Sequence, residues 1–410
     1  RRFDAAQLTT TEGEPLEILH TGEQNRNAGA DFSNARLRIG ETTWAGNVEM
    51  HLKSSDWLQH NHQRDKAYDN VILHVVLEED KPIHRASGER IPCLEKKRRI
   101  PPKLSALYQK LLQNEYWIPC QHHFYEAAEV TKNLWLDRLL VERLEQKTEV
   151  IHTAWERNAR DWEETFYQFV ARNFGMKINA EPFEMLARSL PQSILAKHRD
   201  SLFQLESLLF GQAGLLEKEF EDGHPEGLKK EYAYLRKKYE LTPVAAAAWK
   251  FLRLHPGNFP TLRIAQFARL SQQSTHLFSK ILEVEKLEEI EQFFTLQLDG
   301  YWLTHYVFDK PSEERNKSFG KDAIQLLTIN TLVPFLFFYG SMRGQDHFKD
   351  RALRWLEEMP GEKNAIISSW EKLGMNAPTA YRTQALLQLK NNYCGAKKCL
   401  NCAIGNAILK

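Results

Sequence analysis

The chain has 410 residues, with 55 Lys and Arg against 54 Asp and Glu, and a formal net charge of +1. Apolar residues make up 42% and charged residues 27%, which excludes a disordered or collagen-like chain. So small a net charge gives no global attraction to nucleic acid or to acidic membranes, and any such binding requires a local patch. The length predicts two or three domains, or one small domain with a long helical body.

The cysteine content and the apolar runs indicate a cellular compartment. Five cysteines, thinly spread except near the C-terminal end, do not form a disulfide framework. The sequence opens with no secretory signal, and no apolar run reaches the roughly 18 residues of a membrane helix. The nearest approach, at 332–339, contains Pro334. We therefore expect a cytoplasmic protein with reduced thiols and no membrane association.

The first hundred residues have the pattern of a mixed sheet. Glu12-Gly13 is a hairpin-type turn signal, and apolar residues alternate with polar ones in 35–39 and 48–52. The run VILHVVL at 71–77 is typical of a central strand covered on both faces. The polar stretch 56–69 lies between two predicted strands, where a helix would form a crossover. The sequence thus predicts a small α/β domain over residues 1–102.

The texture changes after Pro101-Pro102. Apolar residues now recur at intervals of three and four, which predicts about a dozen helices. The fold class is therefore mixed α+β: a small N-terminal α/β domain followed by a large all-α body over residues 103–410. We expect helices beginning near Leu104 to cover the strand at 71–77, because an uncovered strand of this hydrophobicity would aggregate.

Asp31, Glu49, His51 and Lys53 form the first group with chemical potential. Residues two apart on a strand share a face, so Glu49, His51 and Lys53 form a polar row while the apolar residues between them point into the core. If the strand beginning near Asp31 pairs beside this row, two carboxylates converge in the geometry that holds Mg²⁺ or Mn²⁺. This is the chemistry of metal-assisted phosphodiester hydrolysis. The alternative is an amphipathic sheet with a solvated polar face.

This arrangement resembles the PD-(D/E)xK nuclease superfamily, in which an Asp on one strand and a (D/E)-x-K motif on the next surround the metal. By this resemblance Asp31 is the Asp, Glu49 the second carboxylate, and His51 takes the place of the Lys. Ala30 stands where the superfamily prefers Pro. An imidazole can be a base or a ligand, so His51 changes the mechanism, and Lys53 on the same face can compensate.

Three functional interpretations follow, the last of them from His51, His60 and His62 rather than from the resemblance. The first is a metal-dependent nuclease-like protein that binds and hydrolyses DNA or RNA. The second is a non-catalytic binding or scaffold protein built on a degenerate nuclease core. The third is a transition-metal hydrolase that uses histidines. Carboxylates converging on one point would favour the first interpretation, and clustered imidazoles would favour the third.

Three stretches carry a closer resemblance to another family. They are Gly22-x-x-Asn25 through Gly29-Ala30-Asp31-Phe32, Val48-Glu49-Met50-His51 through Ser55-Asp56-Trp57, and Tyr68 through the run VILHVV at 71–76. They resemble an uncharacterised bacterial family, found mainly in Bacteroidetes and known as a domain of unknown function. The resemblance extends over the whole chain, including the C-terminal cysteines, and implies no activity.

A histidine-rich segment follows the polar row. His60 and His62 share a face if the backbone is extended, where they could bind a transition metal, but they point apart if it is helical. His74 lies in the apolar strand and needs a hydrogen-bond partner when buried, for which Asp56 or His62 is available. The functional alternative places His60 and His62 in the pocket of the first group, in contact with a scissile phosphate or a leaving group.

The spacing Cys394-x₄-Cys399-x₂-Cys402 is the sharpest signal in the chain. A Cys-x₂-Cys pair brings two thiolates to one metal ion, which predicts Zn²⁺ or an iron–sulfur cluster. Lys397 and Lys398 should lower the pKa values of these thiols. The alternative is a loop whose thiols hold no metal. Candidates for the fourth ligand are Cys93, Cys120, His122 and His123. By analogy, some nucleases of the superfamily named above carry iron–sulfur clusters.

A last group lies around the break at 255–260, where two prolines, a Gly and an Asn interrupt a helical pattern. Arg253, Asn258 and Arg263 surround it and are candidates for contacts with substrate phosphates. We expect Thr261 to cap a helix starting near Leu262, whose N-terminus can receive an anion. The alternative is a solvated helix face.

Overall fold

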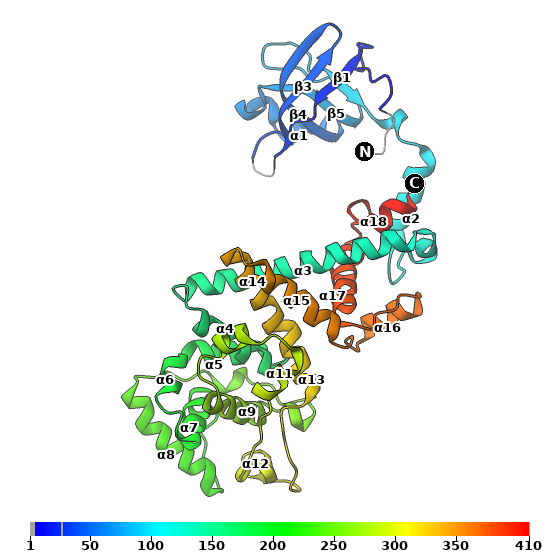
Figure 1. Cartoon of the computed structure of the whole chain (residues 1–410). Coiled ribbons are helices and arrows are strands. Elements are labelled where there is room, and N and C mark those ends of the chain that lie inside the picture. The colour runs from blue at the N-terminus through cyan, green and yellow to red at the C-terminus, as the bar shows by residue number, and fades with distance from the viewer. Residues whose placement is uncertain (1–4, 26–27, 410) are drawn as a thin grey trace. The chain divides into compact units, whose positions relative to one another are not determined.

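The computed structural model describes residues 5–25 and 28–409. The chain divides into two compact units (Figure 1). The sheet unit comprises residues 1–120 and 405–410, and the helical unit comprises residues 121–404. A small N-terminal sheet followed by a mostly helical body confirms the mixed α+β class. The division falls after Cys120 rather than after residue 102, because helix α2 (Pro102–Gln113) belongs to the sheet unit.

The strands of the sheet unit are β1 (Leu16–His20), β2 (Glu23–Gln24), β3 (Phe32–Ile39), β4 (Thr42–Lys53), β5 (Val71–Glu78) and β6 (Cys93–Glu95). They form one sheet in the order β1-β3-β4-β5-β6, with β2 paired to β3. The pairs β1–β3 and β3–β4 are antiparallel, whereas β4–β5 and β5–β6 are parallel. A parallel step requires a crossover. Residues 54–70 provide it, through the short turns α1 (Asp56–Gln59), η1 (His62–Arg64) and η2 (Lys66–Tyr68).

The sheet curls until its two edges are bridged. The N–H of Thr11 donates to the carbonyl of Cys93 on β6 at 2.8 Å, and the N–H of Leu16 on β1 donates to the carbonyl of Leu8 at 2.8 Å. Segment 8–16 therefore joins the outer strands. The first apolar cluster lies within this curled sheet and consists of Leu8, Leu16, Ala35, Leu37, Ile39, Val48, Ile72, Leu73, Val75 and Leu94.

A second apolar cluster lies under the crossover. It consists of Ala30, Trp57, Val71, Ile83 and Ile91, with Leu58 and Tyr68 packed against it. Within the described residues, these two clusters cover the two faces of β5, and neither contains a residue of α2. The prediction that helices beginning near Leu104 cover this strand is therefore corrected: the curled sheet and its own crossover bury it.

Strand β4 extends past the covered part of the sheet. Val48 is 8% exposed, but Met50 is 39% and Leu52 is 71% exposed. The sequence predicted that the apolar residues alternating with the polar row point into the core. This prediction is wrong for Met50 and Leu52. On the opposite face Glu49 is only 6% exposed, so the polar side of β4 is the more deeply covered one here.

An extra residue in β5 sets the direction of its side chains. Asn47 pairs with Val71, whereas the next residue, Val48, pairs with Leu73. Because of this bulge, Val71 and His74 both lie toward Trp57. An apolar strand can in this way present one buried histidine to the crossover.

The helical unit is helical apart from one hairpin of β7 (His305–Val307) and β8 (Lys310–Pro311). Its longer helices are α3 (Glu129–Arg157), α4 (Trp162–Phe174), α5 (Ala180–Ser189), α7 (Leu202–Gln212), α8 (Gly223–Lys238), α9 (Pro260–Gln273), α14 (Val333–Arg343), α15 (Asp346–Glu358), α16 (Ala365–Lys372) and α17 (Ala380–Gln388). Shorter elements are η4 (Gln121–Glu126), α6 (Gln192–Ala196), η5 (Ala246–Ala248), η6 (Pro256–Asn258), α10 (Leu277–Glu283), α11 (Leu287–Phe293), α12 (Tyr301–Thr304), α13 (Lys321–Leu327), η7 (Thr328–Leu332), η8 (Leu389–Cys394) and η9 (Cys399–Asn401). Helix α18 (Ala403–Ile408) spans the division between the units.

One apolar stretch is longer than the sequence predicted. Helices α13, η7 and α14 run continuously from Lys321 to Arg343, because Pro334 lies in the first turn of α14, after the π-helical turn η7. Among the described residues this helix is long and apolar enough to cross a membrane, but 78% of its most apolar window is buried. Such burial is that of a core helix of a soluble protein.

Candidate metal centre in the sheet unit

One carboxylate and four imidazoles meet beneath the crossover. Glu49 and His51 come from β4, His74 comes from β5, and His60 and His62 come from the crossover. Nδ1 of His51 lies 2.8 Å from Nε2 of His74, and its Nε2 lies 3.1 Å from Nδ1 of His60. Oε1 of Glu49 lies 3.5 Å from Nε2 of His51 and 3.5 Å from Nε2 of His62.

A left-handed residue brings the two crossover histidines together. His60 closes α1, His62 opens η1, and Asn61 between them has φ 59°. The ring centroids of His60 and His62 are 5.4 Å apart. Neither alternative from the sequence, extended or helical, describes this turn. The signal for it was Asn61 itself, since Asn is among the few residues that adopt this conformation readily.

Two aromatic residues that the sequence gave no role support the cluster. Tyr68 stacks on His62 with ring centroids 3.8 Å apart. Trp57, 2% exposed, points its ring toward His74 at 5.3 Å and toward His62 at 5.4 Å. These contacts restrict the rotation of the imidazoles, which preorganises their nitrogen atoms.

The predicted carboxylates, Asp31 and Glu49, lie next to each other, but each accepts a hydrogen bond from a backbone N–H. The N–H of Asp31 donates to Oε2 of Glu49 at 3.0 Å, and Oδ2 of Asp31 accepts from the N–H of Met50 at 3.0 Å. Lys53 is exposed, and its backbone N–H donates to Asp56 at 2.9 Å. The structure thus brings Asp31, Glu49 and His51 together and leaves the Lys53 side chain at the surface.

Burial dominates the electrostatics of Glu49. Desolvation raises the pKa of this carboxyl to about 7, the N–H of Asp31 lowers it in part, and the charge of Asp31 adds a further rise. A carboxyl with such a pKa changes protonation near neutral pH, which suits a general base. Burial, with a further contribution from the Glu49 charge, also raises the pKa of the Tyr68 phenol.

The central imidazoles are held neutral. Burial lowers the pKa of His51 to about 4 and that of His74 to about 3, and neighbouring histidines lower both values further. The pKa of His62 is also lowered, first by burial and then by His60. Neutral imidazoles are the form that binds transition metals.

The donor set fits a transition-metal ion. The ligand atoms of His51, His60 and His62 all lie within 4.8 Å of one another, the one such group among the described residues. A tetrahedral site with bonds of about 2.1 Å separates its ligand atoms by about 3.4 Å. Nε2 of His51 and Nδ1 of His60, 3.1 Å apart, are close to that value, and Oε1 of Glu49 lies 3.5 Å from Nε2 of His51 and from Nε2 of His62.

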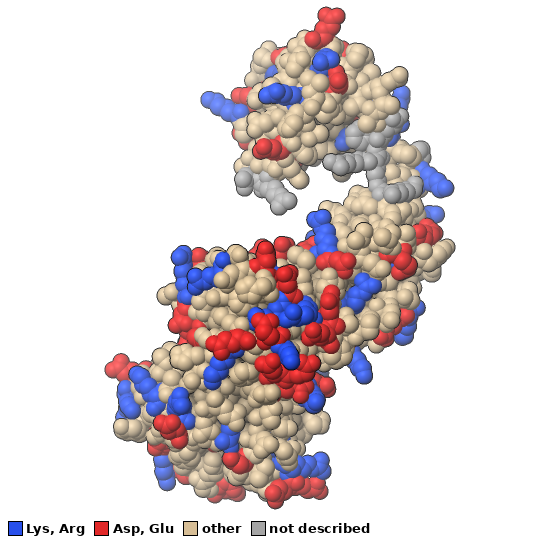
Figure 2. All heavy atoms as spheres, in the orientation of Figure 1, with Lys and Arg blue, Asp and Glu red and all other residues tan. Residues whose placement is uncertain are grey.

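The predicted phosphate contacts belong to the helical unit, and two of them, Asn258 and Arg263, bind each other. Arg263 is 6% exposed and donates to Asn258 at 2.6 Å and to Gln266 at 3.0 Å. Helix α9 begins at Pro260, and the hydroxyl of Thr261 donates to the carbonyl of Tyr306. The predicted cap at Thr261 is therefore wrong. Arg253 is exposed. On the face drawn in Figure 2, acidic and basic residues intermingle over the helical unit.

The C-terminal cysteines belong to the helical unit, where Cys399 opens η9 and Cys402 lies between η9 and α18. Cys394 ends η8 and is half-buried, whereas Cys399 and Cys402 are 6% and 7% exposed. Burial raises the pKa of the Cys399 thiol, with a further rise from Cys402, and this outweighs the opposite effect of Lys397. Lys397 thus lowers this pKa as predicted, but the net shift is upward because burial has the larger effect. Among the described residues the three thiols do not form a group converging on one point, and metal binding there stays a prediction.

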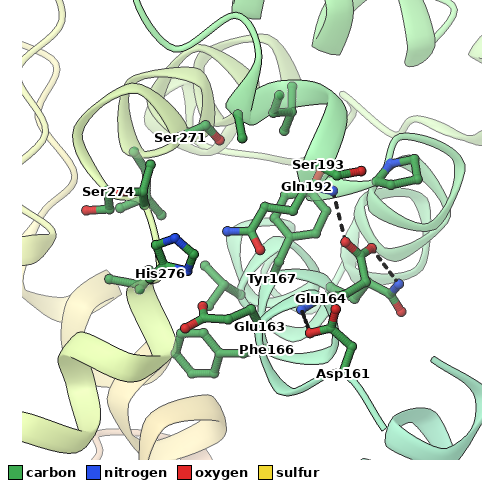
Figure 3. A pocket seen from close by; sticks show the side chains of 18 of the residues that line it. Asp161, Glu163, Glu164, Phe166, Tyr167, Gln192, Ser193, Ser271, Ser274 and His276 are labelled. Carbon is green, nitrogen blue, oxygen red and sulfur yellow. Dashed lines mark hydrogen bonds between the residues drawn. The ribbon is translucent and has the colours of Figure 1, made fainter. Parts of the chain in front are cut away.

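The helical unit contains a cavity of about 650 Å³ (Figure 3). Its carboxylates are engaged in the architecture around it. Asp161 accepts from the N–H of Glu164, and Glu164 accepts from the N–H of Gln192 and from Gln168. Glu163 accepts from two N–H groups at the start of α10. The sequence gave no sign of this cavity, because its walls come from α4, α6 and α9.

The fold and the site together define a two-part protein: a curled mixed sheet that carries a histidine–carboxylate cluster, and a helical body. The chain belongs to the family described as "Protein of unknown function (DUF2851)", which matches residues 1–365. No curated protein and no solved structure matches the chain. The matched residues end before Cys394.

Proposed function

We propose that this protein is a metal-dependent hydrolase of phosphodiester bonds, with its active site in the sheet unit and nucleic acid as its substrate class. The observation that carries the proposal is the convergence of three imidazoles with a buried carboxylate, Glu49, whose pKa is raised to about 7. The order of the motifs supports the phosphodiester part. Asp31 precedes one strand, Glu49-x-His51 lies on the next, and a parallel crossover follows, as the resemblance to PD-(D/E)xK nucleases implies.

The residues have distinct roles in this proposal. His51, His60 and His62 hold the ion, as the separations of their nitrogen atoms allow. When bound, a Zn²⁺- or Mn²⁺-like ion supplies Lewis acidity and lowers the pKa of water. Oε1 of Glu49 accepts the proton of the attacking water, while the N–H of Asp31 holds Oε2 in place.

A second candidate has Mg²⁺ or Mn²⁺ between Asp31 and Glu49. It is favoured by the contribution of the Asp31 charge to the raised pKa of Glu49, because a cation between the two carboxylates would remove this repulsion. Backbone donors to both residues count against it.

The test is a cleavage assay on single- and double-stranded DNA and RNA, with Zn²⁺, Mn²⁺, Co²⁺ or Mg²⁺ added to metal-free protein. We expect activity with transition metals that His51→Ala abolishes. His152→Ala, which changes a histidine of the helical unit, is the matched control and should keep full activity. Activity with Mg²⁺ that Asp31→Asn alone abolishes would favour the second candidate. Stoichiometric metal or nucleic-acid binding without cleavage would favour a binding or scaffold protein.

A further inference from the structure

His74 occupies an unusual place in the sheet unit. It is 1% exposed and lies in the middle of β5, between the buried residues Leu73 and Val75. Its Nε2 lies 2.8 Å from Nδ1 of His51, and its Nδ1 has no hydrogen-bond partner among the described residues. A buried polar atom without a partner costs stability. An apolar residue would therefore serve the core better, and packing alone does not account for a histidine here.

We propose that His74 is a positioning residue: it accepts the Nδ1 proton of His51 in a hydrogen bond and so presents Nε2 of His51 to a transition-metal ion. The inference rests on the proposed function for the presence of that ion.

The two nitrogens of His51 face different surroundings. Nδ1 points toward buried His74, whereas Nε2 points toward His60 at 3.1 Å and Glu49 at 3.5 Å. A neutral imidazole carries one proton, and the nitrogen without it is the one that can bind a metal. With the proton on Nδ1, the lone pair of Nε2 points into the cluster.

His74 is the acceptor that makes this tautomer favourable. Metal-binding histidines commonly donate their other ring N–H to an acceptor behind them, which fixes the ring and its tautomer. Here the 2.8 Å contact to His74 fills that place. The Trp57 ring, 5.3 Å from that of His74, restricts its movement. Without an acceptor, the Nδ1–H of His51 would be buried and unpaired in the metal-bound state.

The test compares His74→Leu, which removes the acceptor, with His74→Gln, whose amide oxygen can reach the position of Nε2. Zn²⁺ affinity is measured by competition with a chromophoric chelator, and Co²⁺ binding by its visible absorption. We expect His74→Leu to weaken binding tenfold to a hundredfold and His74→Gln to remain within a few-fold of wild type. The metal-free His74→Leu protein should melt close to wild type, since it loses the unsatisfied Nδ1 of His74 but leaves Nδ1 of His51 without its partner.

The outcomes separate the inference from the proposed function. Equal affinities in all three proteins would overturn the role of His74 and leave the hydrolase proposal in place. Metal binding that depends on His74, without phosphodiester cleavage, would support the inference and remove the hydrolase. Absence of Zn²⁺ and Co²⁺ binding by the wild type would overturn both. If His74→Leu unfolds, His74→Met provides the same comparison with a more adaptable side chain.

Discussion

The histidine cluster and the helical cavity are both concave or buried places lined by ionisable groups, yet their polar atoms are used differently. In the cavity, Glu163 and Glu164 accept from backbone N–H groups of neighbouring segments. In the cluster, Glu49 and His51 meet other titratable side chains. Both oxygens of Glu163 and of Glu164 are engaged by backbone or amide donors. In Glu49 only Oε2 accepts a backbone N–H, and Oε1 faces His51 and His62. This difference favours the histidine cluster of the sheet unit, rather than the cavity, as the candidate active site.

The largest expected effect distinguishes Glu49 in the cluster from Glu164 in the cavity wall. Glu49→Gln should lower phosphodiester cleavage by about 10²–10⁴-fold, because it removes the general base. Its unfolding free energy should not fall, since a costly buried charge is also removed. Glu164→Gln, in the cavity wall, should leave cleavage unchanged and destabilise the helical unit. Steady-state kinetics measure the cleavage by each variant, and urea unfolding measures its stability. Equal cleavage by wild type and Glu49→Gln would show that Glu49 is not the general base and would remove the chemical difference between the cluster and the cavity.

The second prediction concerns stability in acid for metal-free protein. The folded-state pKa values of His51 and His74 are about 4 and about 3, below the ordinary 6.5. Between pH 6.5 and 4 the unfolded chain therefore binds protons that the folded sheet unit refuses, and stability falls as pH falls. Urea unfolding at a series of pH values should show this loss.

Glu49 acts in the opposite direction. Its folded-state pKa of about 7 lies above 4.5, so the folded chain gains a proton, and stability, as pH falls between these values. Glu49→Gln should therefore steepen the acid loss, and His74→Leu should make it shallower. Parallel pH profiles for all three proteins would contradict the buried, neutral state of these histidines.

The third prediction concerns the left-handed turn at Asn61. A β-branched residue there costs about 1–2 kcal/mol, which the chain can relieve by moving His60 and His62 apart. Asn61→Val should weaken Zn²⁺ binding by about tenfold, while Asn61→Gly should preserve it, because Gly adopts positive φ freely. Titration with a competing chelator distinguishes them. Unchanged affinity in Asn61→Val would mean that the turn does not align the ligands.

The smallest expected effect tests the cavity. Glu163→Ala removes the acceptor for the N–H groups of Phe278 and Ser279 at the start of α10. We expect a loss of about 1 kcal/mol in the stability of the helical unit, with metal affinity and cleavage unchanged. Glu156→Ala, at an exposed position on α3, is a control that should change neither the stability of the helical unit nor cleavage. A change in cleavage caused by Glu163→Ala would give the cavity a functional role.

Much of the fold could be read from local patterns. The alternation at 35–39 gave β3 its buried and exposed faces, and the run at 71–77 gave the central strand, because side-chain direction along a strand has a fixed period of two. The exposure of Met50 and Leu52 could not be read in this way. It depends on where the curled sheet ends along β4, which no residue of that strand encodes.

The sequence by itself determined the chemical inventory of the site: Asp31, Glu49 and His51 at strand spacing, and two further histidines nearby. Only the tertiary structure decided how they combine. The bulge in β5 turns His74 toward His51, and the left-handed Asn61 folds His60 and His62 over the same strand. Both are single-residue departures from regular geometry. Which side chains the bulge and the turn bring together depends on strand pairing and packing between distant segments. A local periodicity in the sequence therefore cannot predict it.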